Sequence, residues 1–109
     1  MSWYTNLQVA VLSGTGTTFN SLHEHIISIL DRDGISHELF TDICSSFETG
    51  EATCNVHPAY LYQFFVEIAP LLSPLNLEIR CLGEEFRHTW IMGIASGKID
   101  FNVGPWDYE

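Results

Sequence analysis

Acidic side chains are the residues of this sequence with the most obvious capacity for chemistry. Fourteen Asp and Glu residues oppose four Lys and Arg residues, which gives a formal net charge of −10. A metal-dependent or acid–base enzyme would need several carboxylates to converge in one pocket beside polar supports. Here they are distributed over predicted strands and turns, which is typical of a broad negative surface. The candidate contact residues are Asp42, Glu48, Glu51, Glu78, Glu84, Glu85 and Asp100.

A charge of this sign excludes some partners and favours others. Phosphate groups repel the chain, so we expect no direct binding to DNA or RNA and no binding to an anionic membrane. We expect attraction to basic protein surfaces, including those that proteins use to hold nucleic acid. The alternative, which the sequence leaves open, is a solvated negative surface that only keeps the protein soluble.

The histidines and cysteines show no spacing that concentrates a reaction. His23 and His25 are two positions apart on a predicted helix and point in different directions, so they cannot chelate one ion together. Cys44, Cys54 and Cys81 share no C-x-x-C spacing, and each falls in a predicted strand as a small apolar residue. We therefore expect no metal site, no cofactor and no enzymatic activity, and a reducing cytoplasm as the environment.

A glycine-containing loop, Gly14-Thr15-Gly16, lies between a predicted strand and a predicted helix. Nucleotide-binding folds bind phosphate at such a place. The third glycine is absent and no Gly-Lys-Ser/Thr follows, so the loop is interpreted as a helix entry.

The stretch from Leu75 to Val103 is the clearest structural signal. It alternates apolar and polar residues in three segments, which predicts three consecutive antiparallel strands. Ser96-Gly97 supplies a two-residue turn before the last of them. A sheet with one apolar face needs a covering layer, for which the helical segments upstream are the candidates. The alternating apolar residues are Leu75, Leu77, Ile79, Cys81, Phe86, His88, Trp90, Met92, Ile94, Ile99, Phe101 and Val103.

Two helices and three further strands are predicted upstream. The first helix is capped by Thr17 or Thr18 and ends at Gly34, and the second begins at Pro58. A turn over Glu48–Glu51 is expected to join the second and third strands as a hairpin. The strands are Trp3 to Leu12, a segment marked by Leu39, Ile43 and Phe47, and a segment marked by Ala52, Cys54 and Val56.

This order of elements predicts an α+β fold in a single domain covering residues 1–109. The expected architecture is a ferredoxin-like two-layer sandwich, β-α-β-β-α-β followed by a C-terminal β-hairpin, with two helices on one face of an antiparallel sheet. Asp42, Glu78 and Asp100 are expected on the exposed sheet face.

The segment from Ala52 to Gly97 resembles the C-terminal half of small ferredoxin-like proteins of phages and plasmids. It carries a proline-led helix, a Gly83-Glu84-Glu85 turn and a final Ser96-Gly97 hairpin. The resemblance is one of pattern. It implies the fold and an origin in a mobile element, and it transfers no functional residue.

Small acidic proteins of mobile elements are similar to anti-CRISPR and anti-restriction inhibitors. The leading hypothesis is an anti-CRISPR protein that mimics nucleic acid and blocks DNA access to a type I CRISPR effector subunit in the host bacterial cytoplasm. The alternatives are an immunity protein that neutralises a basic nuclease toxin, and a small enzyme or ligand-binding domain on the same fold. A monomer or a weak edge-to-edge dimer is expected.

Overall fold

A computed structural model describes residues 5–13, 17–73, 75–83 and 89–103. The notable departure from the expected order is a run of helices between the first two strands. The strands are β1 (Thr5–Ser13), β2 (Glu51–Cys54), β3 (Asn76–Leu82), β4 (Trp90–Ala95) and β5 (Lys98–Val103), and the helices are α1 (Thr17–Asn20), α2 (His23–Asp33), α3 (Glu38–Thr49) and α4 (Pro58–Ile68), with the 3-10 helix η1 (Ala69–Leu72).

The five strands form one antiparallel sheet in the order β2-β1-β3-β4-β5. β3 is therefore central, and β2 and β5 are the two edges. The three strands predicted from Leu75 onwards are confirmed in their described parts, although Phe86 and His88 lie outside the described residues. A bulge interrupts the β4–β5 ladder between Gly93 and Ile94.

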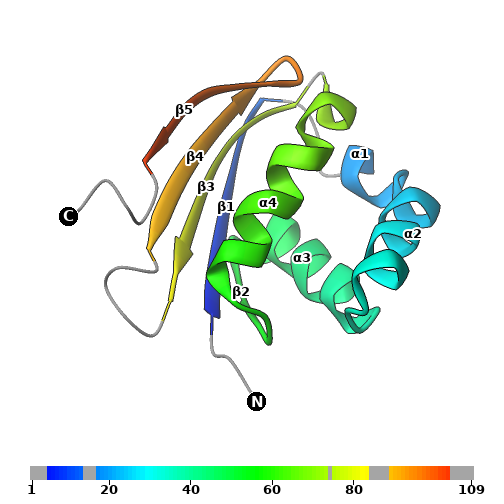
Figure 1. Ribbon diagram of the computed structural model, residues 1–109. Coiled ribbons are helices and arrows are strands. Elements are labelled where there is room, and N and C mark those ends of the chain that lie inside the picture. The colour runs from blue at the N-terminus through cyan, green and yellow to red at the C-terminus, as the bar shows by residue number, and fades with distance from the viewer. Residues whose placement is uncertain (1–4, 14–16, 74, 84–88, 104–109) are drawn as a thin grey trace.

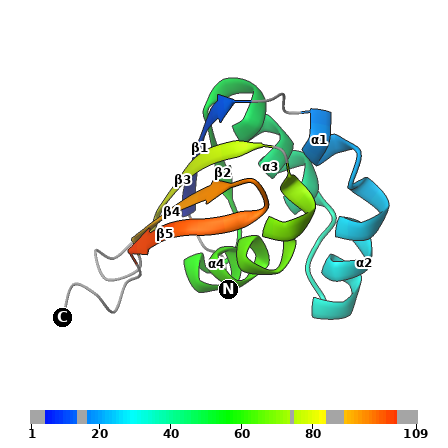
Figure 2. The same cartoon turned by 90° about the horizontal axis from the view of Figure 1, so that it is seen from above.

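Helices cover one face of this sheet, and no described helix or strand covers the other, which we call the open face (Figures 1 and 2). The alternation along the strands explains the choice of face. Leu7 and Val9 of β1 and Ile79 of β3 are buried toward the helices, whereas Gln8 and Arg80 point to the open face. The molecule is thus a two-layer α+β structure, as expected, with all of its large core on one side of the sheet.

Buried aromatic and aliphatic side chains of the helices fill the space against the sheet. α4 contributes Leu61, Phe64 and Phe65, and Trp90 of β4 is completely buried beside them. The Trp90 indole Nε1–H donates to the carbonyl oxygen of Pro58 at 2.9 Å, which gives this polar group a partner inside the core. This bond ties the start of α4 to strand β4.

The predicted second strand, marked by Leu39, Ile43 and Phe47, is wrong. These residues lie on helix α3, where a spacing of four places them on one face of a 3.6-residue helix. Cys44 and Asp42 consequently lie on a helix and not on a strand.

The predicted hairpin over Glu48–Glu51 is also absent, because α3 runs directly into β2. Gly50 ends the helix with φ of 96°, in the left-handed region, and donates its N–H to Ser46 O. β2 is shorter than expected, since Val56 lies beyond its end. With one strand fewer before α4, the ferredoxin-like strand order is not confirmed.

Several predicted element boundaries are confirmed. Gly34 ends α2 with φ of 69°, and Pro58 is the first residue of α4. The single helix expected after Thr17 is divided into α1 and α2 at Ser21-Leu22. The Ser96-Gly97 turn has positive φ at both residues, 53° and 79°, as a tight hairpin between β4 and β5 requires.

Candidate functional site

Three of the predicted contact residues lie on one continuous piece of chain. Asp42 and Glu48 are on α3, and Glu51 is the first residue of β2. The structure adds Glu38, the first residue of α3, one helical turn before Asp42. We call these four residues, Glu38, Asp42, Glu48 and Glu51, the α3–β2 acidic side. The first three project from α3, whereas Glu51 is paired with Gln8 and therefore projects from the β2 edge toward the open face of the sheet.

Apolar contacts hold α3 in place from the other side. Leu39 and Ile43 are buried in the core, while Phe40 and Phe47 stack on Phe19 with ring centroids 5.4 and 4.8 Å apart. The apolar residues thus occupy one face of α3, and the carboxylates lie on other faces of the same helix. Glu38, Asp42 and Glu48 therefore lie on a helix whose orientation is set by packing.

No basic residue on these elements offsets this charge. The sequence contains no Lys or Arg between Gly34 and Ile79. Within the described residues, none of the four carboxylates of the α3–β2 acidic side forms an ion pair. They are therefore available to a partner.

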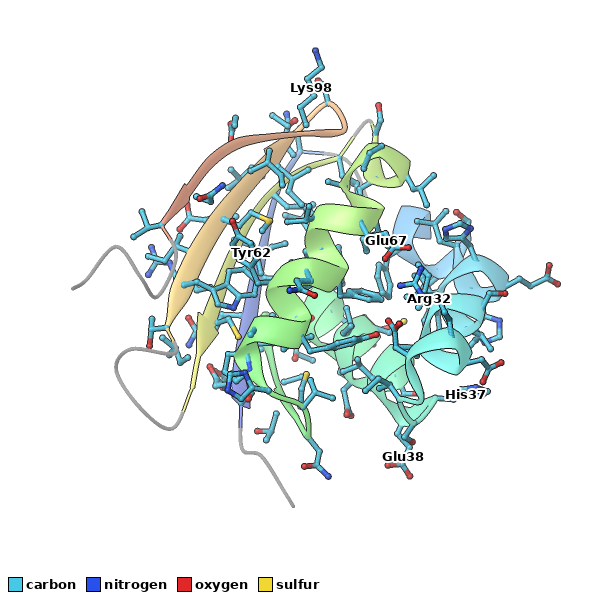
Figure 3. The ribbon with its side chains drawn as sticks, viewed as in Figure 1. Arg32, His37, Glu38, Tyr62, Glu67 and Lys98 are labelled. Atoms are coloured by element: carbon cyan, nitrogen blue, oxygen red, sulfur yellow. The ribbon has the colours of Figure 1, made fainter. Side chains whose placement is uncertain are left out.

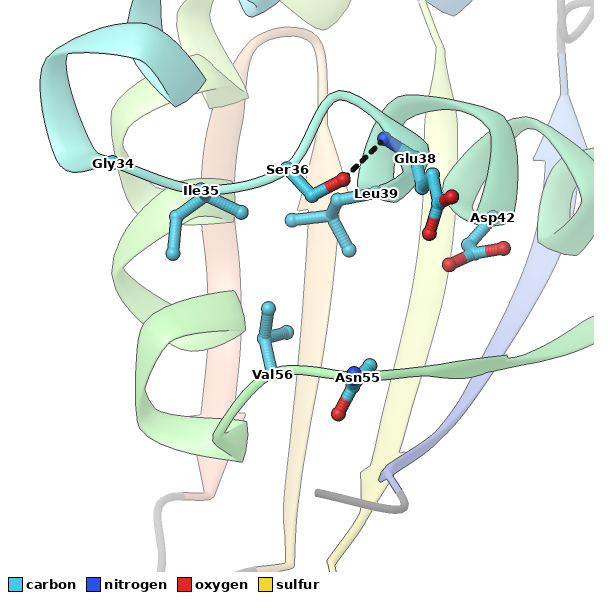
Figure 4. A pocket seen from close by; sticks show the side chains of 8 residues that line it. All are labelled: Gly34, Ile35, Ser36, Glu38, Leu39, Asp42, Asn55 and Val56. Atoms are coloured by element: carbon cyan, nitrogen blue, oxygen red, sulfur yellow. Dashed lines mark hydrogen bonds between the residues drawn. The ribbon is translucent and has the colours of Figure 1, made fainter. Parts of the chain in front are cut away.

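A cavity of about 210 Å³ opens at one end of this side, between the start of α3 and the segment that follows β2. Figure 4 shows the Glu38 and Asp42 side chains next to each other on α3, with Asn55 and Val56 across the cavity. Ser36 supports the first turn, because its Oγ accepts a hydrogen bond from the Glu38 N–H at 3.2 Å. The cavity thus has two carboxylates on one wall.

The electrostatic consequence is visible at Asp42. Partial burial raises the pKa of its carboxyl, and the neighbouring Glu38 charge raises it further. Burial also raises the pKa of the Cys54 thiol to about 12, with a smaller contribution from Asp42. In both cases burial is the larger cause, and the nearby carboxylate adds a smaller repulsion of negative charge.

The other predicted contact residues do not join this site. Glu78 lies on the open face of the sheet, where Arg80 pairs with it at 2.9 Å and offsets its charge. Asp100 is on β5, at the opposite edge of the sheet from Glu51. Glu84 and Glu85 lie outside the described residues. The expectation that Asp42, Glu78 and Asp100 share the exposed sheet face is therefore wrong for Asp42.

The remaining described cations are also distant from the α3–β2 acidic side or engaged elsewhere. Arg32 forms ion pairs with Asp33 and Glu67 between α2 and α4 (Figure 3). Lys98 projects from the β4–β5 hairpin at the end of the molecule away from Glu38 (Figure 3). Neither compensates the acidic side.

The described histidines and cysteines are used in local contacts. His37 Nε2 lies 2.6 Å from an Asp31 carboxylate oxygen, and Cys44 Sγ donates to Asn20 Oδ1 at 3.0 Å. Cys54 and Cys81 are fully buried free thiols. In the part of the chain that the structure describes, no group of three or more His, Cys, Asp or Glu residues is arranged to hold a metal ion.

No family model, curated protein or solved structure matches this chain. Across the described residues, the helices are too short or too polar for any of them to cross a membrane.

Proposed function

We propose that this protein is an acidic inhibitor from a phage or other mobile element that acts through its α3–β2 acidic side. In this proposal it is an anti-CRISPR protein of the host bacterial cytoplasm. It occupies the Lys/Arg surface with which a type I effector subunit holds DNA, and thereby blocks DNA access. It inhibits by binding alone, without turnover.

The observation that supports this proposal is the concentration of uncompensated charge on one rigid unit. Four carboxylates follow α3 and the start of β2, while the acidic residues elsewhere include Glu67 and Glu78, which are paired with arginine. A basic surface that binds phosphates by charge and spacing also attracts carboxylates presented at fixed positions. Long-range attraction raises the rate of association, and this effect is lost as salt screens it.

The test compares two variants that lose the same charge in different places. The site variant carries Glu38→Gln, Asp42→Asn, Glu48→Gln and Glu51→Gln. The matched control carries Glu24→Gln, Asp31→Asn, Glu78→Gln and Asp100→Asn, and so has the same net charge. Circular dichroism and thermal unfolding establish that both are folded.

DNA binding by a purified type I effector complex is then measured in the presence of each protein, with a basic nuclease assayed in parallel. We expect the site variant to lose inhibition by at least about tenfold and the control to retain it. Inhibition by the parent should weaken as salt is raised. Full inhibition by the site variant would exclude the α3–β2 acidic side as the contact surface.

A further inference from the structure

The acidic side borders a free edge of the sheet. β2 pairs with β1 and with no other described strand. The Val9 N–H donates to Gly50 O at 3.0 Å, which identifies Val9 and Gly50 as a hydrogen-bonded pair of the antiparallel ladder. Hydrogen-bonded and non-hydrogen-bonded pairs alternate along such a ladder. Ala52 and Cys54 therefore direct their backbone groups toward β1, and Glu51 and Thr53 direct theirs away from it.

Thr53 is the centre of this free edge. Its side chain is exposed, and by the alternation its N–H and C=O have no partner among the described residues. The Glu51 carbonyl is already in use, since it accepts a hydrogen bond from the Thr49 hydroxyl at 2.9 Å. The groups open to a further strand are thus the Glu51 N–H and both backbone groups of Thr53.

The carboxylates lie where the side chains of an added strand would reach. Glu51 is on the edge strand itself, and the cavity with Glu38 and Asp42 lies beside Asn55 and Val56, the residues that continue β2 (Figure 4). Extended peptides bind sheet edges through main-chain hydrogen bonds, and their side chains enter adjacent pockets. The charge of this cavity selects a cationic side chain.

The opposite edge of the sheet, strand β5, is less suited to pairing with an added cationic strand. β5 carries Lys98 as well as Asp100, and the bulge at Gly93/Ile94 disturbs its ladder with β4. Mixed charge and a bulge are features that oppose strand pairing at an edge.

We propose that the partner binds this site with an extended Lys- or Arg-containing segment, which pairs with β2 as a sixth strand and places a cationic side chain between Glu38 and Asp42. This inference rests on the proposed function, in which the partner surface is basic, and it specifies the form of that surface. The contact then has two parts, namely backbone pairing at Thr53 and ion pairing in the cavity.

The test uses a defined probe, the blocked peptide acetyl-Lys-Val-Lys-Val-Lys-Val-Lys-amide. Its matched control has the same sequence with every backbone amide N-methylated, so that it keeps all the ammonium groups but cannot donate backbone hydrogen bonds. We expect the methylated peptide to bind at least about tenfold more weakly in isothermal titration calorimetry. Equal affinity of the two peptides would overturn the proposed strand pairing.

Amide hydrogen exchange, followed by NMR, gives a residue-level readout on the unmodified protein. The Glu51 and Thr53 amides should exchange rapidly in the free protein and at least about tenfold more slowly with saturating peptide. The Ala52 and Cys54 amides should be protected in both states, since they bond to β1. Unchanged exchange at Thr53 on peptide binding would contradict the proposal.

Thr53→Pro removes an outward-facing donor at a position where an edge strand tolerates proline, and Thr53→Ala keeps that donor. We expect about tenfold weaker peptide binding for Thr53→Pro and parent-like binding for Thr53→Ala. If Thr53→Pro does not fold, the methylated peptide and the exchange data still decide the question.

The two proposals fail in different ways. Loss of inhibition by the site variant, together with equal binding of both peptides, would retain the acidic contact surface and reject the strand. Full inhibition by the site variant would reject the proposed function whatever the peptides do.

Discussion

Arg32 on α2 forms a two-pronged ion pair with Glu67 on α4, in which Nη1 lies 3.0 Å from Oε2 and Nη2 lies 2.8 Å from Oε1. The same guanidinium donates to both carboxylate oxygens of Asp33, and Oδ2 of Asp33 also accepts a hydrogen bond from the Tyr60 hydroxyl at 2.8 Å. This network joins α2 to α4 through two residues, Arg32 and Glu67, that are 35 positions apart in the sequence. It lies on the surface, so its contribution to stability depends on salt and pH.

Arg32→Gln should lower the urea midpoint of unfolding slightly at neutral pH and low salt. The pairing with Arg32 lowers the pKa of both Asp33 and Glu67. A carboxyl whose pKa is lower in the folded state stabilises the fold at pH values above its pKa in the unfolded state. This stabilisation is lost as the pH falls through its pKa in the folded state. The difference from the parent should therefore shrink below about pH 4 and in high salt. A difference that persists under both conditions would indicate a packing role for Arg32 instead.

Thr5→Val should cost about 1–2 kcal/mol in free energy of unfolding. The Thr5 hydroxyl is buried and donates to Val56 O at 2.7 Å, so an isosteric methyl leaves that carbonyl without its donor. Chemical denaturation measures the loss. Thr53→Val, on the exposed edge strand, is the matched control and should change stability by less than about 0.5 kcal/mol.

Asp42→Asn should raise stability at pH 7, and under the proposed function it should also weaken partner binding. The folded-state pKa of Asp42 is raised above its unfolded value, so the ionised carboxylate opposes folding and stability falls as pH rises through that interval. The gain should be a few tenths of a kcal/mol, because solvent still screens the group, and should vanish below about pH 3. Thermal unfolding across pH tests it. Asp100→Asn, the same change on the edge strand β5, provides the comparison, and an equal gain there would contradict the local explanation.

Gly97→Ala should destabilise the protein more than Gly34→Ala. Both glycines have positive φ, 79° and 69°, so either alanine carries a backbone cost of about 1 kcal/mol. At Gly97 the new Cβ would also lie 3.3 Å from Pro70 O, whereas at Gly34 it meets nothing within 4 Å. Denaturation midpoints of the two variants give the comparison. Equal losses of stability in the two variants would show that η1 shifts to make room for the added methyl group.

Strand β3 was predictable because one of its faces is buried and the other is exposed, which imposes a period of two, and the Ser96-Gly97 turn marked the hairpin of β4 and β5. Helix α3 was not recognised, although Leu39, Ile43 and Phe47 recur every four residues. Its interior is rich in residues such as Thr41, Cys44 and Ser45, which have weak helix propensity, so packing decides its conformation.

The acidic side was only partly predictable for the same reason. The sequence pattern predicts a strand at Leu39–Phe47 and so places Asp42 on a sheet face, and it does not single out Glu38, one helical turn earlier. The pairing of Glu78 with Arg80 was readable from their spacing of two on a strand. The cavity could not be predicted from the sequence, because it depends on how Asn55 and Val56 approach α3 in space.

Since α3 continues into β2 through Gly50 alone, residues 38–54 present core and surface positions in one unbroken segment. Ile43 and Cys54 are buried and anchor this segment in the core. Glu38, Asp42 and Glu51 are not part of the core. Substitutions can therefore accumulate at the outward positions while the scaffold beneath them keeps its shape.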